Sequence, residues 1–226
     1  MQHPSLAPLP TQWPVGYENA HSNLSSLLEY GPRYEESWNG DVMSMLIHMF
    51  PVISPENYVI KPQCNLRKPR LLLDGENLEQ AGPRTSIESR GHATAHTRWD
   101  HNHEPERYRP DFIIDKGARN SQKLVAVIEL KREGSLDIRS RERFADYCNR
   151  VVEYDHDVTT GTSALLIVGG TAYAWDRDQI DQLALRSELS DADLEQSISA
   201  DVDTIGFLEI LATIRNRFVQ SIVNNV

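Results

Sequence analysis

The sequence predicts an α/β domain in which helices flank a central β-sheet. Two short apolar runs rich in β-branched residues, at 109–115 and 124–131, are typical of buried strands. Segments with apolar residues at helical spacing precede and follow these runs. The chain has 226 residues, which suits one such domain with a good-sized core. We expect a Pro-rich N-terminal arm at 1–20 and a single domain at 21–226.

The N-terminal part is expected to contain two helices and two short strands. Helices are predicted at 22–30, where Gly-Pro ends the periodic pattern, and from Glu35 to the residue before Pro51. Strands are predicted at 58–60 and, more weakly, at 68–73. The apolar face of the main first helix is expected to comprise Trp38, Val42, Met45, Leu46 and Met49.

The C-terminal part continues the alternation of helices and strands. A helix is predicted at 136–156, and two strands at 163–168 and 171–175 surround a Gly-Gly hairpin turn. An acidic loop or helix start is predicted at 191–195, and an amphipathic closing helix at 205–223. The helix at 136–156 is expected to place on or near one face Ile138, Phe144, Tyr147, Val151 and Tyr154.

Two of the predicted buried strands carry charged residues. Asp111 stands near the start of the first, and Glu129 and Lys131 stand at the end of the second. Strand side chains alternate between faces, so Glu129 and Lys131 share a face. A buried carboxylate without a partner is costly. The pattern therefore predicts a divalent-metal site or a catalytic pair, in which Asp111 and Glu129 offer the oxygen ligands that Mg²⁺ prefers.

The order Pro-Asp, a hairpin-length gap and Glu-x-Lys resembles the PD-(D/E)XK nuclease superfamily. This resemblance implies a restriction-endonuclease-like fold, with a mixed central sheet flanked by helices. It also implies that Asp111 and Glu129 bind magnesium and that Lys131 assists the attacking water. The alternative interpretation is a surface hairpin whose strand ends simply carry charge.

A broader resemblance extends from about Glu29 to Phe218. The segment 34–42, with Glu-Glu-Ser-Trp-Asn, looks like the first-helix signature of a fungal PD-(D/E)XK nuclease-like family, and 164–170 and 205–211 resemble its last strands and C-terminal helix. Glu35 shares the apolar face of its predicted helix and is a further candidate catalytic acid. The alternative is an ordinary first-turn glutamate favoured by the helix dipole.

The helix that follows Glu-x-Lys departs from that family's pattern. The family usually carries a Gln-Leu pair followed by an aromatic residue, and here Arg143 replaces the Gln. Arg143 is therefore a candidate substrate-binding residue. The helix also carries Arg139, Arg141 and Arg150; such a row is usually a solvated face, although in a nuclease it could contact phosphates.

A histidine-rich segment precedes the Asp111 strand. Its histidine spacings can bind zinc, but no cysteine joins them and the second pair, His101 and His103, is not typical of a structural zinc site. A long polar loop is therefore the preferred interpretation. Long loops often carry substrate contacts, and some of these histidines could act as acid or base groups. The candidate substrate-binding residues there are Trp99, His101, His103 and Tyr108, beside His92 and His96.

Charge and composition limit the class of protein. The net charge of −10 opposes an indiscriminate nucleic-acid binder, but residues 84–150 carry 14 Lys and Arg against 11 Asp and Glu. The least acidic region thus contains the predicted site. Two cysteines argue against a disulfide framework, and no secretory signal or membrane segment is recognised, so an intracellular protein, cytoplasmic or nuclear, is expected. The sequence does not indicate an oligomeric state.

Two functions follow as hypotheses. The first is magnesium-dependent hydrolysis of nucleic acid, with DNA as the preferred substrate. The second is a nuclease-like fold recruited as a metal-independent enzyme of fungal specialised metabolism, in which the same charged residues act on a small-molecule substrate as acid and base. A third, weaker hypothesis is a catalytically silent interaction domain.

Overall fold

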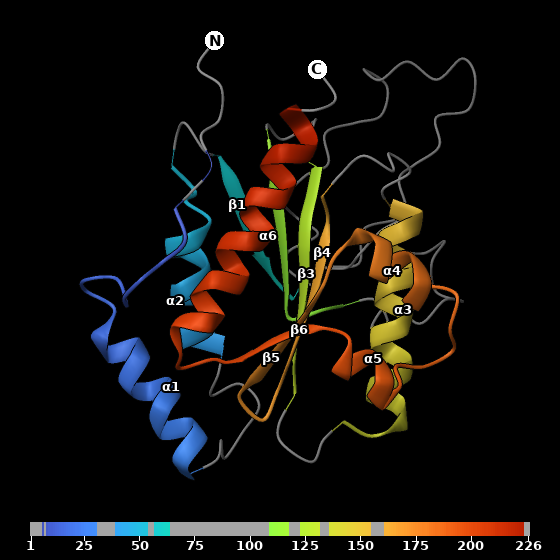
Figure 1. Cartoon of the computed structure of the whole chain (residues 1–226), viewed down its shortest axis with the longest axis horizontal. Helices are drawn as coiled ribbons and strands as arrows, with labels where there is room; N and C mark the ends of the chain where they lie inside the picture. The colour runs from blue at the N-terminus through green and yellow to red at the C-terminus, as the bar shows by residue number, and fades with distance from the viewer. Residues whose placement is uncertain are drawn as a thin grey trace, which may run out of the picture.

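A six-stranded sheet forms the centre of the molecule, with helices on both of its faces (Figure 1). The computed structural model describes residues 6, 8–30, 39–53, 57–63, 109–117, 123–131, 136–154 and 161–223. The helices are α1 (Glu18–Tyr30), α2 (Asn39–Met49), α3 (Ile138–Tyr154), α4 (Arg177–Leu183), α5 (Asp191–Glu195) and α6 (Ile205–Val223). The strands are β1 (Tyr58–Pro62), β2 (Phe112–Lys116), β3 (Lys123–Lys131), β4 (Ser163–Val168), β5 (Thr171–Trp175) and β6 (Ile198–Asp201).

The strands lie in the sheet in the order in which they occur in the chain. All neighbouring strands are antiparallel except β3 and β4, which are parallel and are connected through α3. A parallel pair needs such a crossover, because a tight turn can join only antiparallel strands. The β4–β5 turn uses Gly169 and Gly170 with φ of 57° and 99°, the left-handed region that glycine adopts without strain.

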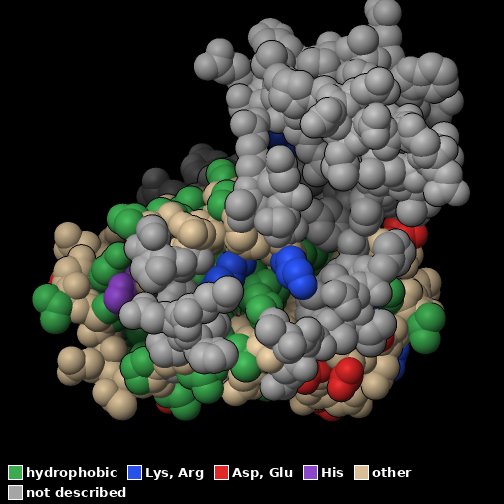
Figure 2. Space-filling view, turned by 90° about the horizontal axis from the view of Figure 1, so that it is seen from above, with side chains coloured by type: hydrophobic (Ala, Val, Ile, Leu, Met, Phe, Trp, Pro, Cys, Tyr) green, Lys and Arg blue, Asp and Glu red, His purple; other side chains and the backbone are tan. Residues whose placement is uncertain are grey.

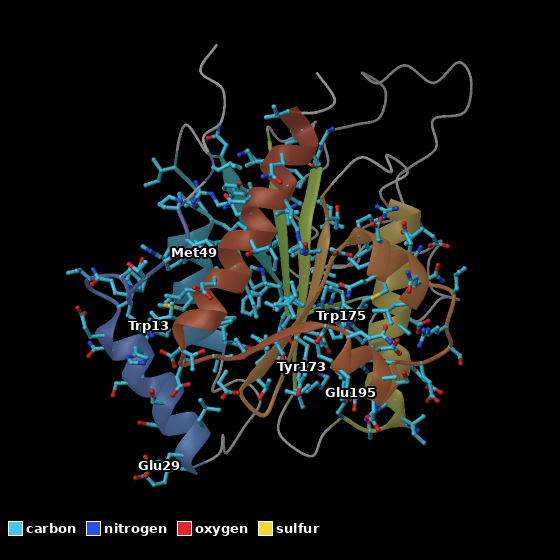
Figure 3. All side chains as sticks on the ribbon, in the orientation of Figure 1. Trp13, Glu29, Met49, Tyr173, Trp175 and Glu195 are labelled. Carbon is cyan, nitrogen blue, oxygen red and sulfur yellow. The ribbon has the colours of Figure 1, made fainter. Side chains whose placement is uncertain are left out.

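Each face of the sheet buries its own apolar core. Helices α1, α2 and α6 pack on one face, against residues such as Phe112, Ile128 and Leu130. Helices α3 and α4 pack on the other face, against Ile113 and Val127. Figure 3 shows Trp175 on the side of α3 to α5, whereas Trp13 and Met49 lie on the side of α2. The strands are buried on both faces, which explains why β3 and β4 read as nearly continuous apolar runs.

Most predicted elements are confirmed, so the chain is a mixed α/β protein. The apolar face of α2 buries Val42, Met45, Leu46 and Met49 as predicted. In α3, Phe144, Tyr147 and Val151 are buried, but the prediction for Ile138 is wrong, because this first residue of the helix is 66% exposed. It precedes the turns of α3 that contact the sheet.

Two elements, α4 and β6, were not predicted. Helix α4 has only seven residues, too few for apolar periodicity to be recognised. A local signal was nevertheless present, because Asp176 and Gln179 form a reciprocal capping box at its start. Strand β6 is an edge strand of four largely exposed residues, so it lacks the apolar run that marks a buried strand. A second capping box, between Ser190 and Asp193, starts α5.

Residues nearer the N-terminus than predicted belong to the folded domain and contact its core. Helix α1 begins at Glu18 and not at residue 22. Trp13 stacks on His21 with ring centroids 4.3 Å apart, and both Trp13 and Tyr17 pack against the core beneath α1. The boundary predicted at residue 20 therefore falls inside this helix, because the aromatic residues ahead of it provide apolar contact area that Pro-rich composition does not reveal.

Several predictions lie outside the described residues. These are the strand at 68–73, the start of the main first helix with Glu35 and Trp38, and the histidine-rich segment with Trp99, His101, His103 and Tyr108. None of the described helices combines the length and apolarity needed to span a membrane.

Candidate active site

Asp111 and Glu129 come from neighbouring strands and share one face of the sheet. Phe112 of β2 pairs with Ile128 of β3. Continuing this antiparallel register by one residue places Asp111 across from Glu129. The carboxylate oxygen Oδ2 of Asp111 accepts a hydrogen bond from the backbone N–H of Leu130 at 2.8 Å, which anchors the side chain to β3. The two acids that are 18 positions apart in sequence are thus brought together by the β2–β3 hairpin.

Glu129 is buried together with Lys131. The Nζ atom of Lys131 lies 2.8 Å from Oε1 of Glu129, and their side chains are 11% and 4% exposed. This same-face placement is the one that strand alternation predicts. Burial, helped by the negative charge of Asp111, raises the pKa of Glu129 to about 7 in spite of the opposing effect of Lys131. A carboxyl group with a pKa near neutrality can change protonation state under physiological conditions.

Helix α3 adds Arg143 and Tyr147 to the cluster. Both side chains interact electrostatically with Glu129: the charge of Arg143 lowers the pKa of Glu129. Burial, followed by the charge of Glu129, raises the pKa of the Tyr147 hydroxyl, which stays protonated at all physiological pH values. Tyr147 and Arg143 are four positions apart, so they lie one above the other on the helix. The sequence predicted Tyr147 only as a residue of the apolar helix face, because tyrosine counts as apolar in a periodicity pattern although its hydroxyl is polar.

The ends of β1 and β2 are fastened together beside the carboxylates. The backbone N–H of Gln63 donates to the carbonyl oxygen of Asp111 at 2.8 Å, and Nε of Arg109 donates to the carbonyl oxygen of Gln63 at 2.6 Å. Gln63 has φ of 46°, a left-handed conformation that costs a residue with a side chain roughly 1 kcal/mol. Two hydrogen bonds to the neighbouring strand hold it in this conformation, and such strain is concentrated at functional sites.

A second acid–lysine pair lies on the same face, farther along β2. Lys61 of β1 forms an ion pair with Asp115, whose side chain is 2% exposed. Lys61 pairs in register with Ile113, the residue midway between Asp111 and Asp115 on β2. Burial raises the pKa of Asp115, and the hydrogen bond and charge of Lys61 oppose that increase. This pair was not predicted, because neither residue belongs to a recognisable motif.

The donor set fits a magnesium ion held by two carboxylates. The Oε2 atom of Glu129 is buried and accepts no hydrogen bond of ordinary geometry within the described part of the chain, although the Tyr147 hydroxyl interacts with this glutamate. Buried polar atoms are nearly always satisfied, so an orphaned carboxylate oxygen beside a second carboxylate is a place for a cation. Across the described ranges, no three His, Cys, Asp or Glu residues gather into a metal-binding group. Magnesium commonly needs no more than one or two carboxylates, with water and phosphate oxygens completing its shell.

Of the predicted site residues that the structure describes, all four are brought together: Asp111, Glu129, Lys131 and Arg143. The arrangement defines a mixed α/β protein with a buried carboxylate–lysine cluster at the end of a central hairpin. Comparison with family models, curated proteins and solved structures finds no match for this chain. The function must therefore be argued from the cluster itself.

Proposed function

We propose that the protein is a magnesium-dependent phosphodiesterase that hydrolyses nucleic acid, with DNA as its first substrate to test, and that its fold is restriction-endonuclease-like. The observation that carries the proposal is the convergence of Asp111, Glu129 and Lys131 at one end of β2 and β3. Two carboxylates and a lysine in this arrangement can serve both metal binding and the chemistry of water attack. The sequential mixed sheet with a single crossover through α3 supports the assignment of the fold.

Magnesium, when bound by Asp111 and Glu129, supplies positive charge at the scissile phosphate. The Lys131 ammonium is held at 2.8 Å from Glu129 and can orient the attacking water or stabilise charge that develops on the phosphoryl oxygens. In the hydrolysis a water oxygen forms a bond to phosphorus, the bond from phosphorus to the leaving oxygen breaks, and that oxygen receives a proton. Because Arg143 is exposed and lies near Glu129, it can contact a non-bridging phosphate oxygen.

The ionisation of Glu129 connects the metal to the protein. A carboxyl group binds magnesium as the carboxylate, so the raised pKa of about 7 means that part of the population must lose a proton when the metal binds. The metal's charge in turn favours the ionised group. Because metal binding and ionisation favour each other, a buried glutamate whose ionised form is destabilised without the metal can still serve as a ligand.

The test of this proposal is cleavage of supercoiled and linear DNA with and without magnesium. The wild-type protein is expected to cleave when magnesium is present and to stop when EDTA is added. The variants Asp111→Asn and Lys131→Ala are expected to lose cleavage while keeping the circular dichroism spectrum of the wild type. No cleavage of DNA or RNA by the wild type, or equal cleavage by Lys131→Ala, would contradict the proposal.

One observation favours the recruited small-molecule enzyme as a second candidate. A glutamate whose pKa is about 7 suits general acid–base catalysis at neutral pH without any metal. The two candidates differ in metal dependence, because only the nuclease requires magnesium. Activity on a small molecule that survives EDTA but is lost in Glu129→Gln would favour the second candidate.

A further inference from the structure

The arginines of α3 fall into two sets that the sequence does not distinguish. Arg141 is engaged within the protein: its Nη1 donates to the carbonyl oxygen of Leu189 at 3.0 Å and its Nη2 to Asp191 at 2.6 Å. Arg150 forms an ion pair with Glu153 at 2.9 Å. Arg141 therefore attaches α3 to the segment that leads into α5, and Arg150 is paired within the helix, so both charges are engaged inside the protein.

The other set, Arg139 and Arg143, is exposed to solvent. The two residues are four positions apart, so they lie on one side of α3, with Cβ atoms about 5–6 Å apart. Arg143 acts electrostatically on Glu129, and both arginines act on Asp137 at the start of the helix. Two exposed guanidinium groups thus lie on the first turns of α3, and that of Arg143 is near the carboxylate–lysine cluster.

We propose that Arg139 and Arg143 bind successive phosphates of one nucleic-acid strand, with Arg143 next to the scissile phosphate and Arg139 on its neighbour. The inference rests on the proposed function and adds the path that the bound strand follows away from the scissile phosphate, along α3. Two guanidinium groups one helical turn apart can each form two parallel hydrogen bonds to a phosphate. The long side chains allow their separation to adjust to the spacing of the phosphates.

Three acidic residues, Asp137, Glu142 and Asp146, also lie along the first turns of α3. Asp137 is occupied as a helix cap, because its Oδ1 accepts the backbone N–H of Ser140 at 2.9 Å. The rest of the protein is strongly acidic, with a net charge of −10 for the chain. A polyanion is therefore repelled by most of the surface, and on α3 the groups that can bind it are the exposed guanidinium groups of Arg139 and Arg143.

The face seen in Figure 2 carries Lys and Arg side chains with hydrophobic ones between them, so positive charge outside the proposed path needs a control. Lys123, an exposed residue at the first position of β3, is a matched control for this alternative. It stands eight positions from Lys131 on the same strand, roughly 26 Å away. Replacing Lys123 removes one positive charge without touching the proposed path.

The experiment measures steady-state cleavage of a fluorescent oligonucleotide in magnesium at several salt concentrations. We expect R139Q to raise KM by about fivefold to tenfold with kcat within about twofold, because the contact is made to a phosphate that does not react. The slope of log(kcat/KM) against log salt should fall in magnitude by about one. The K123Q control should retain the KM and the salt slope of the wild type.

The outcomes separate this inference from the proposed function. If the wild type does not cleave, both fail. If the wild type cleaves but R139Q behaves as K123Q does, or if K123Q alone weakens binding, the assigned path is wrong and the proposed function stands. Inhibition by polyglutamate as strong as that by an uncleavable oligonucleotide of equal charge would likewise overturn the assignment to a nucleic-acid strand in favour of an acidic peptide.

Discussion

Two buried carboxylates, each paired with a lysine, lie on the same face of the sheet, and their surroundings differ. The Glu129–Lys131 pair has a second carboxylate, Asp111, and an arginine close enough to affect its ionisation. In the Asp115–Lys61 pair, the pKa of Asp115 is set by burial and by Lys61, and no second acid contributes to it. Each acid has one buried oxygen without a hydrogen-bond partner within the described ranges.

This difference teaches that a buried ion pair does not by itself mark a catalytic site. Burial and a lysine partner are common to both pairs, so they cannot distinguish function from structure. Of the two pairs, only that of Glu129 is combined with a second carboxylate and an exposed arginine at the end of the strands. We therefore assign chemistry to the Glu129 pair and a structural role to the Asp115 pair, and the predictions below test that contrast.

The largest expected effect is the loss of cleavage in Lys131→Ala. Removal of a residue that orients or protonates reacting groups typically costs 10²–10⁴-fold, so we expect kcat to fall by roughly that factor. The matched variant Lys61→Ala removes the lysine of the other pair and should leave kcat within about threefold. Steady-state kinetics on the same oligonucleotide measures both, and similar losses in the two variants would contradict the assignment.

The next effect is on the pH dependence of stability. Between pH 4.5 and 7 the folded protein retains the proton of Glu129 while the unfolded chain loses it. Since the native state then binds more protons, the free energy of unfolding decreases as pH rises through this window. The whole change is about 3 kcal/mol at most, at about 1.4 kcal/mol per pKa unit.

Urea unfolding of Glu129→Gln from pH 4.5 to 8 measures this contribution. The decrease between pH 4.5 and 7 should become shallower, because the titrating group is absent. Asp115→Asn should also make the pH dependence shallower, but in a window that opens above its ordinary value of 3.8. A pH profile of Glu129→Gln that is parallel to that of the wild type would show that Glu129 is not buried with a raised pKa.

The next effect in size is on magnesium affinity, which should depend on the carboxylates of the Glu129 cluster and not on Asp115. Asp111→Asn removes a proposed ligand and is expected to weaken magnesium binding by about 100-fold, whereas Asp115→Asn should change it less than about threefold. In the wild type the affinity should increase with pH up to about 7, because Glu129 must be ionised to bind. Calorimetry in two buffers of different ionisation enthalpy detects the released proton, and magnesium binding retained in Asp111→Asn would refute the metal site.

The smallest effect concerns Lys61. Lys61→Met leaves the buried Asp115 carboxylate without its partner and should lower the free energy of unfolding by about 1–2 kcal/mol, a value reduced because the Lys61 side chain is 33% exposed. The double variant Lys61→Met with Asp115→Leu should recover most of the loss, since two apolar side chains need no partners. Failure of the double variant to recover stability would assign Asp115 a further interaction.

Local patterns in the sequence were sufficient to predict the helices and strands that have strong apolar periodicity. The strands at β3 and β4 and the helix at α6 were predicted nearly to their ends, because each is a long apolar or amphipathic segment. Short elements such as α4 and β6 were missed, since periodicity needs more residues than they contain. The exposed Ile138 was mispredicted because periodicity does not show where a helix first contacts the sheet.

The sequence by itself identified the candidate site residues and determined that Glu129 and Lys131 share a face, because alternation along a strand is a local property. The tertiary structure decided the rest. Strand register brought Asp111 across from Glu129, the crossover through α3 brought Arg143 and Tyr147 to them, and burial raised the pKa of Glu129. It also separated the engaged arginines of α3 from the exposed ones. These properties depend on contacts between residues distant in the chain and on exclusion of water, which no local pattern specifies.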